Sequence, residues 1–202
     1  MNKNITSILL LICFVFLQSK LTAQSNIETK TLFGNNPKEF GFFVSPAVGI
    51  TQMDGFNSLL LNLRGGLSIN DKFLIGGYFK TSMNDIRPQS ETVPNLYMDY
   101  WTVGGFTEYT LLSKKVIHVT FPLYIGYGEV EMDNESGFTG LGEANFLEIE
   151  PAALLEVNLH KYVRFNVGVG YRIVSQMNYR NFNQSDISGL TGCIGLKFGL
   201  FR

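Results

Sequence analysis

Residues 147–159 read LEIEPAALLEVNL, and this stretch decides the fold. Apolar residues from Leu147 to Leu159 alternate with the acidic residues Glu148, Glu150 and Glu156. A period of two places the two sets on opposite faces of a β-strand. After a short break at His160-Lys161, residues 163–173 (VRFNVGVGYRI) repeat the alternation with basic polar residues, Arg164 and Arg172. The two stretches therefore predict an antiparallel hairpin with one apolar face and one polar face.

The same alternation recurs along the chain, while no helical period or heptad is sustained. The sequence thus predicts an all-β fold, an eight-stranded antiparallel up-and-down barrel. Its expected strands are 40–50, 58–69, 73–80, 101–109, 117–127, 147–159, 163–173 and 190–200.

Composition narrows the class of protein. The 202 residues carry a net charge of −1, and only 16% are charged, whereas 13% are aromatic and 21 are glycine. This argues against a disordered chain, and because no basic cluster is present we expect no nucleic-acid partner.

The N-terminus predicts export. Lys3 precedes an apolar run from Ile5 to Leu17, and the small-residue stretch Leu21-Thr22-Ala23 follows. We expect a signal peptide over 1–23, a periplasmic segment over 24–39 and the barrel over 40–202, with an uncleaved anchor as the alternative to cleavage. Cys193 would be the one cysteine of the mature chain.

The rival to a membrane barrel is a soluble ligand barrel of the lipocalin kind, which has polar residues outside. Here the polar face is mostly Gly, Ser, Ala, Thr and Asn with nine charges, which suits a narrow lumen better than a water-facing surface. The apolar face of the eight segments carries no charge, and a lipid-facing Arg or Lys would cost about 2–4 kcal/mol near the midplane. The pattern therefore favours the membrane barrel, whose partner is outer-membrane lipid.

The connections indicate an orientation. Short turns at 70–71, 112–115 and 160–161 alternate with a modest connection at 52–57 and long polar ones at 82–95, 129–144 and 175–188. Outer-membrane barrels have short periplasmic turns and long extracellular loops. Aromatic residues near the strand ends fit two interfacial girdles: Phe40, Phe73, Tyr109 and Phe198 at the turns, with Phe79, Trp101 and Tyr127 at the loops.

The chain resembles the outer-membrane β-barrel domain family, in particular the small OmpA-, OmpX- and PorT-like barrels. The residues that carry the resemblance are the leader ending Thr22-Ala23-Gln24, the eight alternating segments and a Gly-aromatic last strand over 195–202 (GLKFGLFR). The resemblance implies the outer membrane of a Gram-negative bacterium and insertion by the barrel assembly machinery. The PorT-like members add a hint of accessory work in secretion, by analogy alone.

The alternation places a charge network inside the barrel. Its expected members are Arg64, Lys80, Glu108, His118, Glu148, Glu150, Glu156, Arg164, Arg172 and Lys197. An eight-stranded barrel is just wide enough for side chains to fill, so these groups should pair and close the lumen.

The hairpin around His160 sets the partners within this network. Inward residues on both of its strands have even numbers, which requires an odd-length turn or a bulge near His160. A turn centred on His160 pairs Glu156 with Arg164 and Glu148 with Arg172, and a slide by one residue brings Arg172 opposite Glu150. Either way we expect a carboxylate partner for Arg172.

Catalytic groups are scarce. Beyond the leader the histidines are His118 and His160, both expected at the periplasmic end, so an enzyme acting at the outer rim is disfavoured. His118 could face Glu108 as a base, although a structural hydrogen bond is the favoured interpretation. We expect no catalytic residues, no metal and no cofactor.

The loops supply the remaining candidates. Acidic residues at 129–144 could chelate calcium, but the spacing fits a calcium loop poorly and a solvated loop is favoured. Apolar residues there and in the last loop could contact a protein or glycan, or pack the loops together, and both interpretations stay open. The candidate contacts are Glu129, Glu131, Asp133, Glu135, Phe138, Tyr179 and Phe182.

Two functions from different classes follow. The favoured one is a non-enzymatic outer-membrane barrel with a structural, binding or accessory role in the envelope and a protein partner there. The alternative is a narrow pore or gated channel. A lumen- or rim-based enzyme ranks third, and a soluble periplasmic binder fourth.

Overall fold

A computed structural model describes residues 39–134 and 142–201, which form one closed antiparallel barrel. The predicted leader, the segment 24–38, Glu135 and Phe138 lie outside the described residues. The barrel strands are β1 Phe40–Met53, β2 Phe56–Ile69, β3 Phe73–Ser82, β4 Leu96–Leu111, β5 Ile117–Asn134, β6 Glu143–His160, β7 Val163–Val174 and β10 Gly189–Gly199.

Each strand pairs with its neighbour in the chain, and the first strand pairs with the last. The register between β1 and β10 runs from Phe43 opposite Gly199 to Thr51 opposite Thr191 and completes the ring. The prediction of an eight-stranded barrel is thus confirmed. Among the described residues, no helix is long and apolar enough to cross a membrane.

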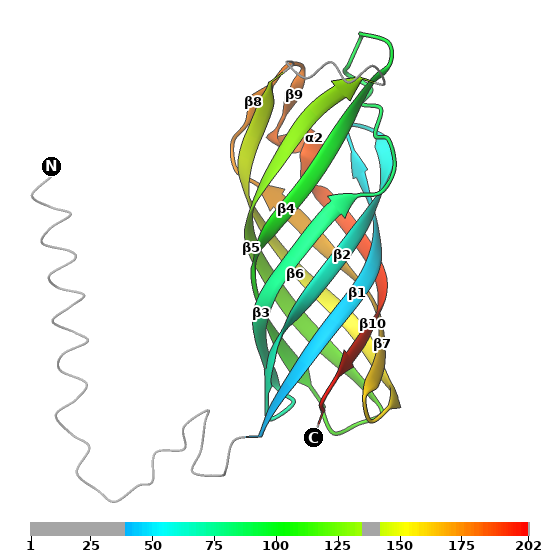
Figure 1. The fold of residues 1–202 in the computed structure, drawn as a ribbon, viewed down its shortest axis with the longest axis vertical. Coiled ribbons are helices and arrows are strands. Elements are labelled where there is room, and N and C mark those ends of the chain that lie inside the picture. The colour runs from blue at the N-terminus through cyan, green and yellow to red at the C-terminus, as the bar shows by residue number, and fades with distance from the viewer. Residues whose placement is uncertain (1–38, 135–141, 202) are drawn as a thin grey trace, which may run out of the picture. The chain divides into compact units, whose positions relative to one another are not determined.

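The two ends of the barrel differ (Figure 1). The turn end carries the connections β2–β3, β4–β5 and β6–β7, and there Asn70 and Asp71 adopt left-handed φ angles of 53° and 52° that these residue types tolerate. The loop end carries the longer connections, including the small hairpin β8 Asn178–Tyr179 and β9 Phe182–Asn183 and the one-turn helix α2 Gln184–Ile187.

Side chains alternate between the outside and the lumen, as the sequence predicts. Along β1 every second residue from Gly41 to Met53 is buried, and the residues between them are exposed. Large apolar residues such as Val169, 62% exposed, face outward. Aromatic pairs mark both ends of this outer face: Phe73 with Tyr109 at the turn end and Trp101 with Tyr127 towards the loop end.

The strands reach further at the loop end than the sequence predicted. Glu129, Glu131 and Asp133, expected in a loop, lie on β5, whose pairing with β4 continues to Asn134. The reason is that Val130 and Met132 between them are buried inside the barrel. The β1–β2 connection is also shorter than the expected 52–57, because Asp54 and Gly55 form a tight hairpin with positive φ angles.

The β6–β7 hairpin contains the bulge that the even-numbered inward residues require. The register shifts between Asn158 and His160, so that Asn158 lies opposite Arg164 and Glu156 opposite Asn166. The expected register that placed Glu156 opposite Arg164 is therefore wrong, because each of these residues faces the next inward position of the other strand. The observed register is the expected alternative with a slide by one residue, and it runs from Asn158 opposite Arg164 to Glu148 opposite Val174, which brings Glu150 opposite Arg172.

Candidate functional site

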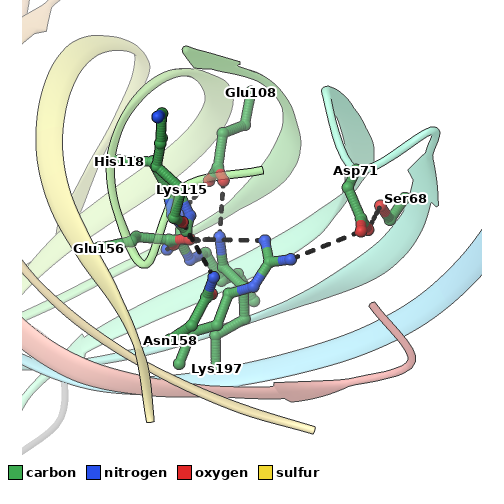
Figure 2. A network of polar contacts seen from close by, with 10 residues as sticks. Ser68, Asp71, Glu108, Lys115, His118, Glu156, Asn158 and Lys197 are labelled. Carbon is green, nitrogen blue, oxygen red and sulfur yellow. Dashed lines mark hydrogen bonds and ion pairs between the residues drawn. The ribbon is translucent and has the colours of Figure 1, made fainter. Parts of the chain in front are cut away.

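The lumen holds a cluster of ionic side chains near the turn end, which we call the turn-end cluster. Figure 2 shows it around Glu108 and Glu156. Arg64 Nη1 lies 2.6 Å from Glu108 Oε2, and Lys197 Nζ lies 2.6 Å from Glu108 Oε1 and also contacts Glu156. Its members, from six strands and one turn, are Arg64, Asp71, Glu108, His118, Glu156, Arg164 and Lys197.

A second group, the mid-barrel cluster, lies nearer the loop end. Lys80 Nζ is 2.8 Å from Glu148 Oε1 and 2.5 Å from Glu150 Oε2. The hydroxyls of Tyr78 and Tyr100 donate to Glu148, and that of Thr191 donates to Glu150. Each carboxylate therefore has several donors, which is the condition for keeping a buried charge.

Tyr124 joins the two clusters. Arg64 donates to its hydroxyl at 3.0 Å, and Lys80 Nζ lies 4.7 Å from the centre of its ring. The Tyr78 ring also needs space in the lumen. A Cβ added to Gly126 would run into the Tyr78 hydroxyl, so glycine is required there. Small inward residues thus make room for the tyrosines that carry the network across the barrel.

The structure places all ten expected network residues inside the barrel and at most 6% exposed. It adds Asp71, which turns the expected balance of five basic against four acidic residues into five against five, leaving His118 aside. Sequence analysis missed Asp71 because it belongs to a turn, where alternation carries no information. Tyr78, Tyr100 and Tyr124 could have been found from their inward parity.

Two expected pairings in the network are wrong. His118 Nε2 lies 3.1 Å from Glu156 Oε2, and not beside Glu108, since Glu108 pairs with Pro122 across β4 and β5. Arg172 has no carboxylate within ion-pair distance among the described residues. Instead it donates to the Ile187 carbonyl and the Thr51 hydroxyl and lies over the Tyr100 ring, because Glu150, which the register brings opposite it, is bound by Lys80 and Thr191.

Above the mid-barrel cluster the lumen is filled by apolar side chains, which we call the apolar plug. Strand residues such as Tyr100 and Phe146, whose rings stack, meet residues that the loops fold inward. Its buried members are Met53, Leu60, Ile86, Leu96, Met98, Tyr100, Val130, Met132, Phe146, Val174, Met177, Tyr179, Phe182 and Ile187.

The plug corrects the loop candidates. Tyr179 and Phe182, considered as contacts for a partner, are 8% and 2% exposed, and the Tyr179 hydroxyl donates to the Gly142 carbonyl at 2.5 Å. They pack the loops together, which is the other interpretation that the sequence allowed. Glu129, Glu131 and Asp133 instead lie on the outward face of β5, where Trp101 Nε1 donates to Glu129.

An ion pair ties two loops together over the plug. Arg180 Nε donates to Glu91 Oε2 at 2.7 Å, and Asn181 donates to the Ser90 carbonyl. The hydrogen bond from Arg180 lowers the pKa of Glu91 below its usual value and raises that of Arg180. The loops between β3 and β4 and between β7 and β10 thus hold each other closed.

The described part of the interior does not meet the requirements of a metal site. No three His, Cys, Asp or Glu side chains there gather as metal ligands. The cavity beside Lys80, Tyr124 and Glu150 measures about 20 Å³, room for about one water molecule. The arrangement can fill the lumen and hold the strands in register.

Comparison with solved structures places this geometry in a class. Neisserial surface protein A superposes with a TM-score of 0.56 at 9% identity, over 83% of this chain and all of that protein. The chain has the fold of an eight-stranded outer-membrane β-barrel. Ail of Yersinia pestis, solved in complex with the heparin analogue sucrose octasulfate, matches at 15% identity and a TM-score of 0.46, over 81% of this chain and 99% of that one.

OprG, an outer-membrane protein of Pseudomonas aeruginosa, matches at 11% identity and a TM-score of 0.46, over 81% of this chain and 96% of that one. No protein-family model matches the sequence, and a comparison with curated proteins finds no match. At these identities the likeness establishes the fold alone, in agreement with the resemblance to the small OmpA- and OmpX-like barrels noted from the sequence.

Proposed function

We propose that the protein is a closed, non-enzymatic barrel of the outer membrane that works at its two ends and not through its lumen. The turn end faces the periplasm and the loop end faces outward, as in other barrels with short turns and long loops. The role is structural, or the binding of an envelope or extracellular partner. The observation that carries this proposal is the filled lumen.

Two successive layers support it. The turn-end and mid-barrel clusters cross the lumen with ion pairs such as Lys197 to Glu108 and Lys80 to Glu148, each between side chains at most 2% exposed. Beyond them the buried side chains of the apolar plug are hydrophobic, with the hydroxyls of Tyr100 and Tyr179 bound to protein acceptors. An ion would have to break paired charges and then cross an apolar region, and both steps are costly.

Conductance tests this against the alternative of a narrow pore or gated channel. The purified barrel in planar bilayers should give no steady single-channel current, and removing two plug side chains together (Phe182→Ala with Ile187→Ala) should still give none, because the ionic layers remain. Steady currents from the unmodified protein would favour the pore.

The location and orientation have their own test. The folded barrel should fractionate with the outer membrane and migrate differently on a denaturing gel before and after boiling. In a Cys193→Ser background, a thiol reagent on intact cells should label Val93→Cys in the exposed loop between β3 and β4 but not Lys72→Cys in a turn. The opposite labelling would reverse the orientation.

Partners are part of the proposal as well. Lipid surrounds the outward apolar face, the barrel assembly machinery inserts the chain after its leader is removed, and an envelope protein binds one end. Crosslinking of the tagged barrel in its native membrane, followed by co-purification, separates the two roles. A single stable protein favours the accessory role, whereas its absence favours the structural one.

A further inference from the structure

A cavity of about 550 Å³ opens at the turn end, inside the mouth of the barrel. Each of the three turns contributes to its wall, through residues 70–71, 113–114 and 160–161, and Asn158, Arg164 and Phe201 complete it. Small-molecule sites in proteins have volumes of about 300–1,000 Å³ and a few polar groups that converge on the ligand. The cavity has the size of such a site.

Arg164 is the cation in this wall with hydrogen-bonding capacity to spare, and Asn158, which also lines the cavity, has an Oδ1 without a hydrogen bond among the described residues. Arg164 is 3% exposed, and the central carbon of its guanidinium lies over the Phe201 ring at 3.7 Å from the ring centre. Among the described residues its Nε and Nη1 make no hydrogen bond. The nearest carboxylate oxygens, of Asp71 at 3.7 Å and Glu156 at 3.9 Å, lie beyond hydrogen-bonding distance.

The neighbouring groups cannot easily turn to Arg164, because they are engaged elsewhere. Glu156 contacts Lys197 and lies 3.1 Å from His118, and Asp71 accepts a hydrogen bond from Ser68 at 3.2 Å (Figure 2). The contact with the Phe201 ring meanwhile restricts the movement of the guanidinium. A buried cation with restricted movement and free N–H groups is prepared for an anion.

The charge of the wall sets the ligand's charge. Lys114, Lys161 and Arg164 contribute three positive charges, and Asp71 contributes one negative charge, which leaves +2 without counting His160. The two lysines are exposed at the rim and can fold over a bound molecule. Arginine presents a planar fork that matches a carboxylate.

We propose that this turn-end cavity binds a small ligand with two carboxylates, of the size of one or two acidic amino-acid residues. Arg164 holds one carboxylate at the base, and Lys114 and Lys161 hold the other at the rim. Under the orientation proposed above the ligand comes from the periplasm, but the binding itself does not depend on that orientation.

N-acetylglutamate is a suitable probe, with its neutral diamide as the matched ligand control. Titrated into the full barrel in a neutral detergent at low salt, it should bind saturably at one site and shift the Arg164 Nε–H resonance. Lys161→Gln should weaken binding about three- to tenfold and Arg164→Gln more than tenfold, since one charge-assisted hydrogen bond is worth roughly that factor or more.

Lys72→Gln is the matched protein control. Lys72 is also an exposed lysine in a turn, but it does not line the cavity, so this variant should bind as the parent does. If Arg164→Gln does not fold, the comparison of Lys161→Gln with Lys72→Gln still decides. The proposal is overturned by equal binding of the diamide, by equal losses in the two lysine variants, by tighter binding of inorganic phosphate, or by the absence of saturation.

Discussion

The two halves of the lumen are filled in different ways. In the half towards the turns, six strands and the turn residue Asp71 bring charged side chains together, and Glu156 and Lys197 are both fully buried. In the half towards the loops, apolar strand residues meet side chains from loops, among them Ile86, Met177 and Ile187. Both halves join residues far apart in sequence, but loops cover the second half and contribute side chains to it.

The difference indicates which contacts stabilise the strands of the barrel and which stabilise the loops at its end. Removing one member of the ionic clusters leaves its partners buried without compensation, and those partners lie on several strands. Removing a plug residue leaves a cavity that the loops can relax around. Variants in the ionic half should therefore lower the stability of the whole barrel, whereas variants in the plug should mainly destabilise the loops.

The largest effect is expected for Glu156→Ala, in the turn-end cluster. Lys197, His118 and Arg64 would lose a shared carboxylate while remaining buried, and losses of this kind cost about 3–5 kcal/mol. Unfolding in urea from detergent micelles, followed by the gel shift of the folded barrel, measures the cost. Glu143→Ala, at the exposed start of β6, is the control and should change stability by under about 0.5 kcal/mol.

Phe182→Ala should affect the loop end alone. Truncating this ring, which is 2% exposed, should cost roughly 3 kcal/mol locally. Faster amide exchange in residues 177–187 would show it, while the urea midpoint of the barrel moves much less than in Glu156→Ala. Met83→Ala, at a 55% exposed loop position, should leave both measurements unchanged. A midpoint shift as large as that of Glu156→Ala would break the distinction between the two halves.

Arg172 connects the halves and sharpens the comparison. Arg172→Ala removes the hydrogen bonds from Arg172 to Ile187 and Thr51, and bonds from charged groups contribute about 1.5–3 kcal/mol each. We expect a lower barrel midpoint together with faster exchange around α2, and still no conductance. If the barrel lost stability without any change in amide exchange around α2, the hydrogen bond from Arg172 to the Ile187 carbonyl would not be what connects the two halves.

The smallest effect is the response of the loops to acid. Because the pKa of Glu91 is lowered in the folded loops, its contact with Arg180 contributes fully above the unfolded pKa and fades as the pH falls through the lowered value. A partly exposed pair is worth about 0–1 kcal/mol. Amide exchange at residues 178–183 should rise below about pH 4 relative to Glu91→Gln, which lacks the titrating group. If the parent and Glu91→Gln showed the same dependence of amide exchange on pH, the contact between Glu91 and Arg180 would not stabilise the loops.

The comparison also explains what the sequence could predict. Strict alternation from residue 147 to 159 predicted the faces of β6, and the same parity placed all ten network residues inside. Their partners could not be predicted, because contacts such as Lys80 with Glu148 cross the lumen between strands that are not neighbours. Arg172 shows this most clearly, since the carboxylate opposite it is held by other donors.

The sequence contains a pattern that indicates the extension of β5 beyond Tyr127. Along 117–127 the odd-numbered residues are apolar and face outward, but at Glu129, Glu131 and Asp133 the odd-numbered residues are acidic. Val130 and Met132 take over the apolar role on the inner face. The alternation thus keeps a period of two, but beyond Tyr127 the outward residues of β5 are acidic and the inward residues are apolar.

The span of the turn-end cluster has a consequence for how the chain is assembled. Lys197 lies on the last strand, 89 residues after Glu108, and it also contacts Glu156 on β6. Until β10 pairs, Glu108 and Glu156 lack one of the cations that contact them in the closed barrel, although Arg64 is already present on β2. Contacts so distant in sequence form slowly. We therefore expect the full set of ion pairs in the turn-end cluster to form only when β10 closes the barrel against β1.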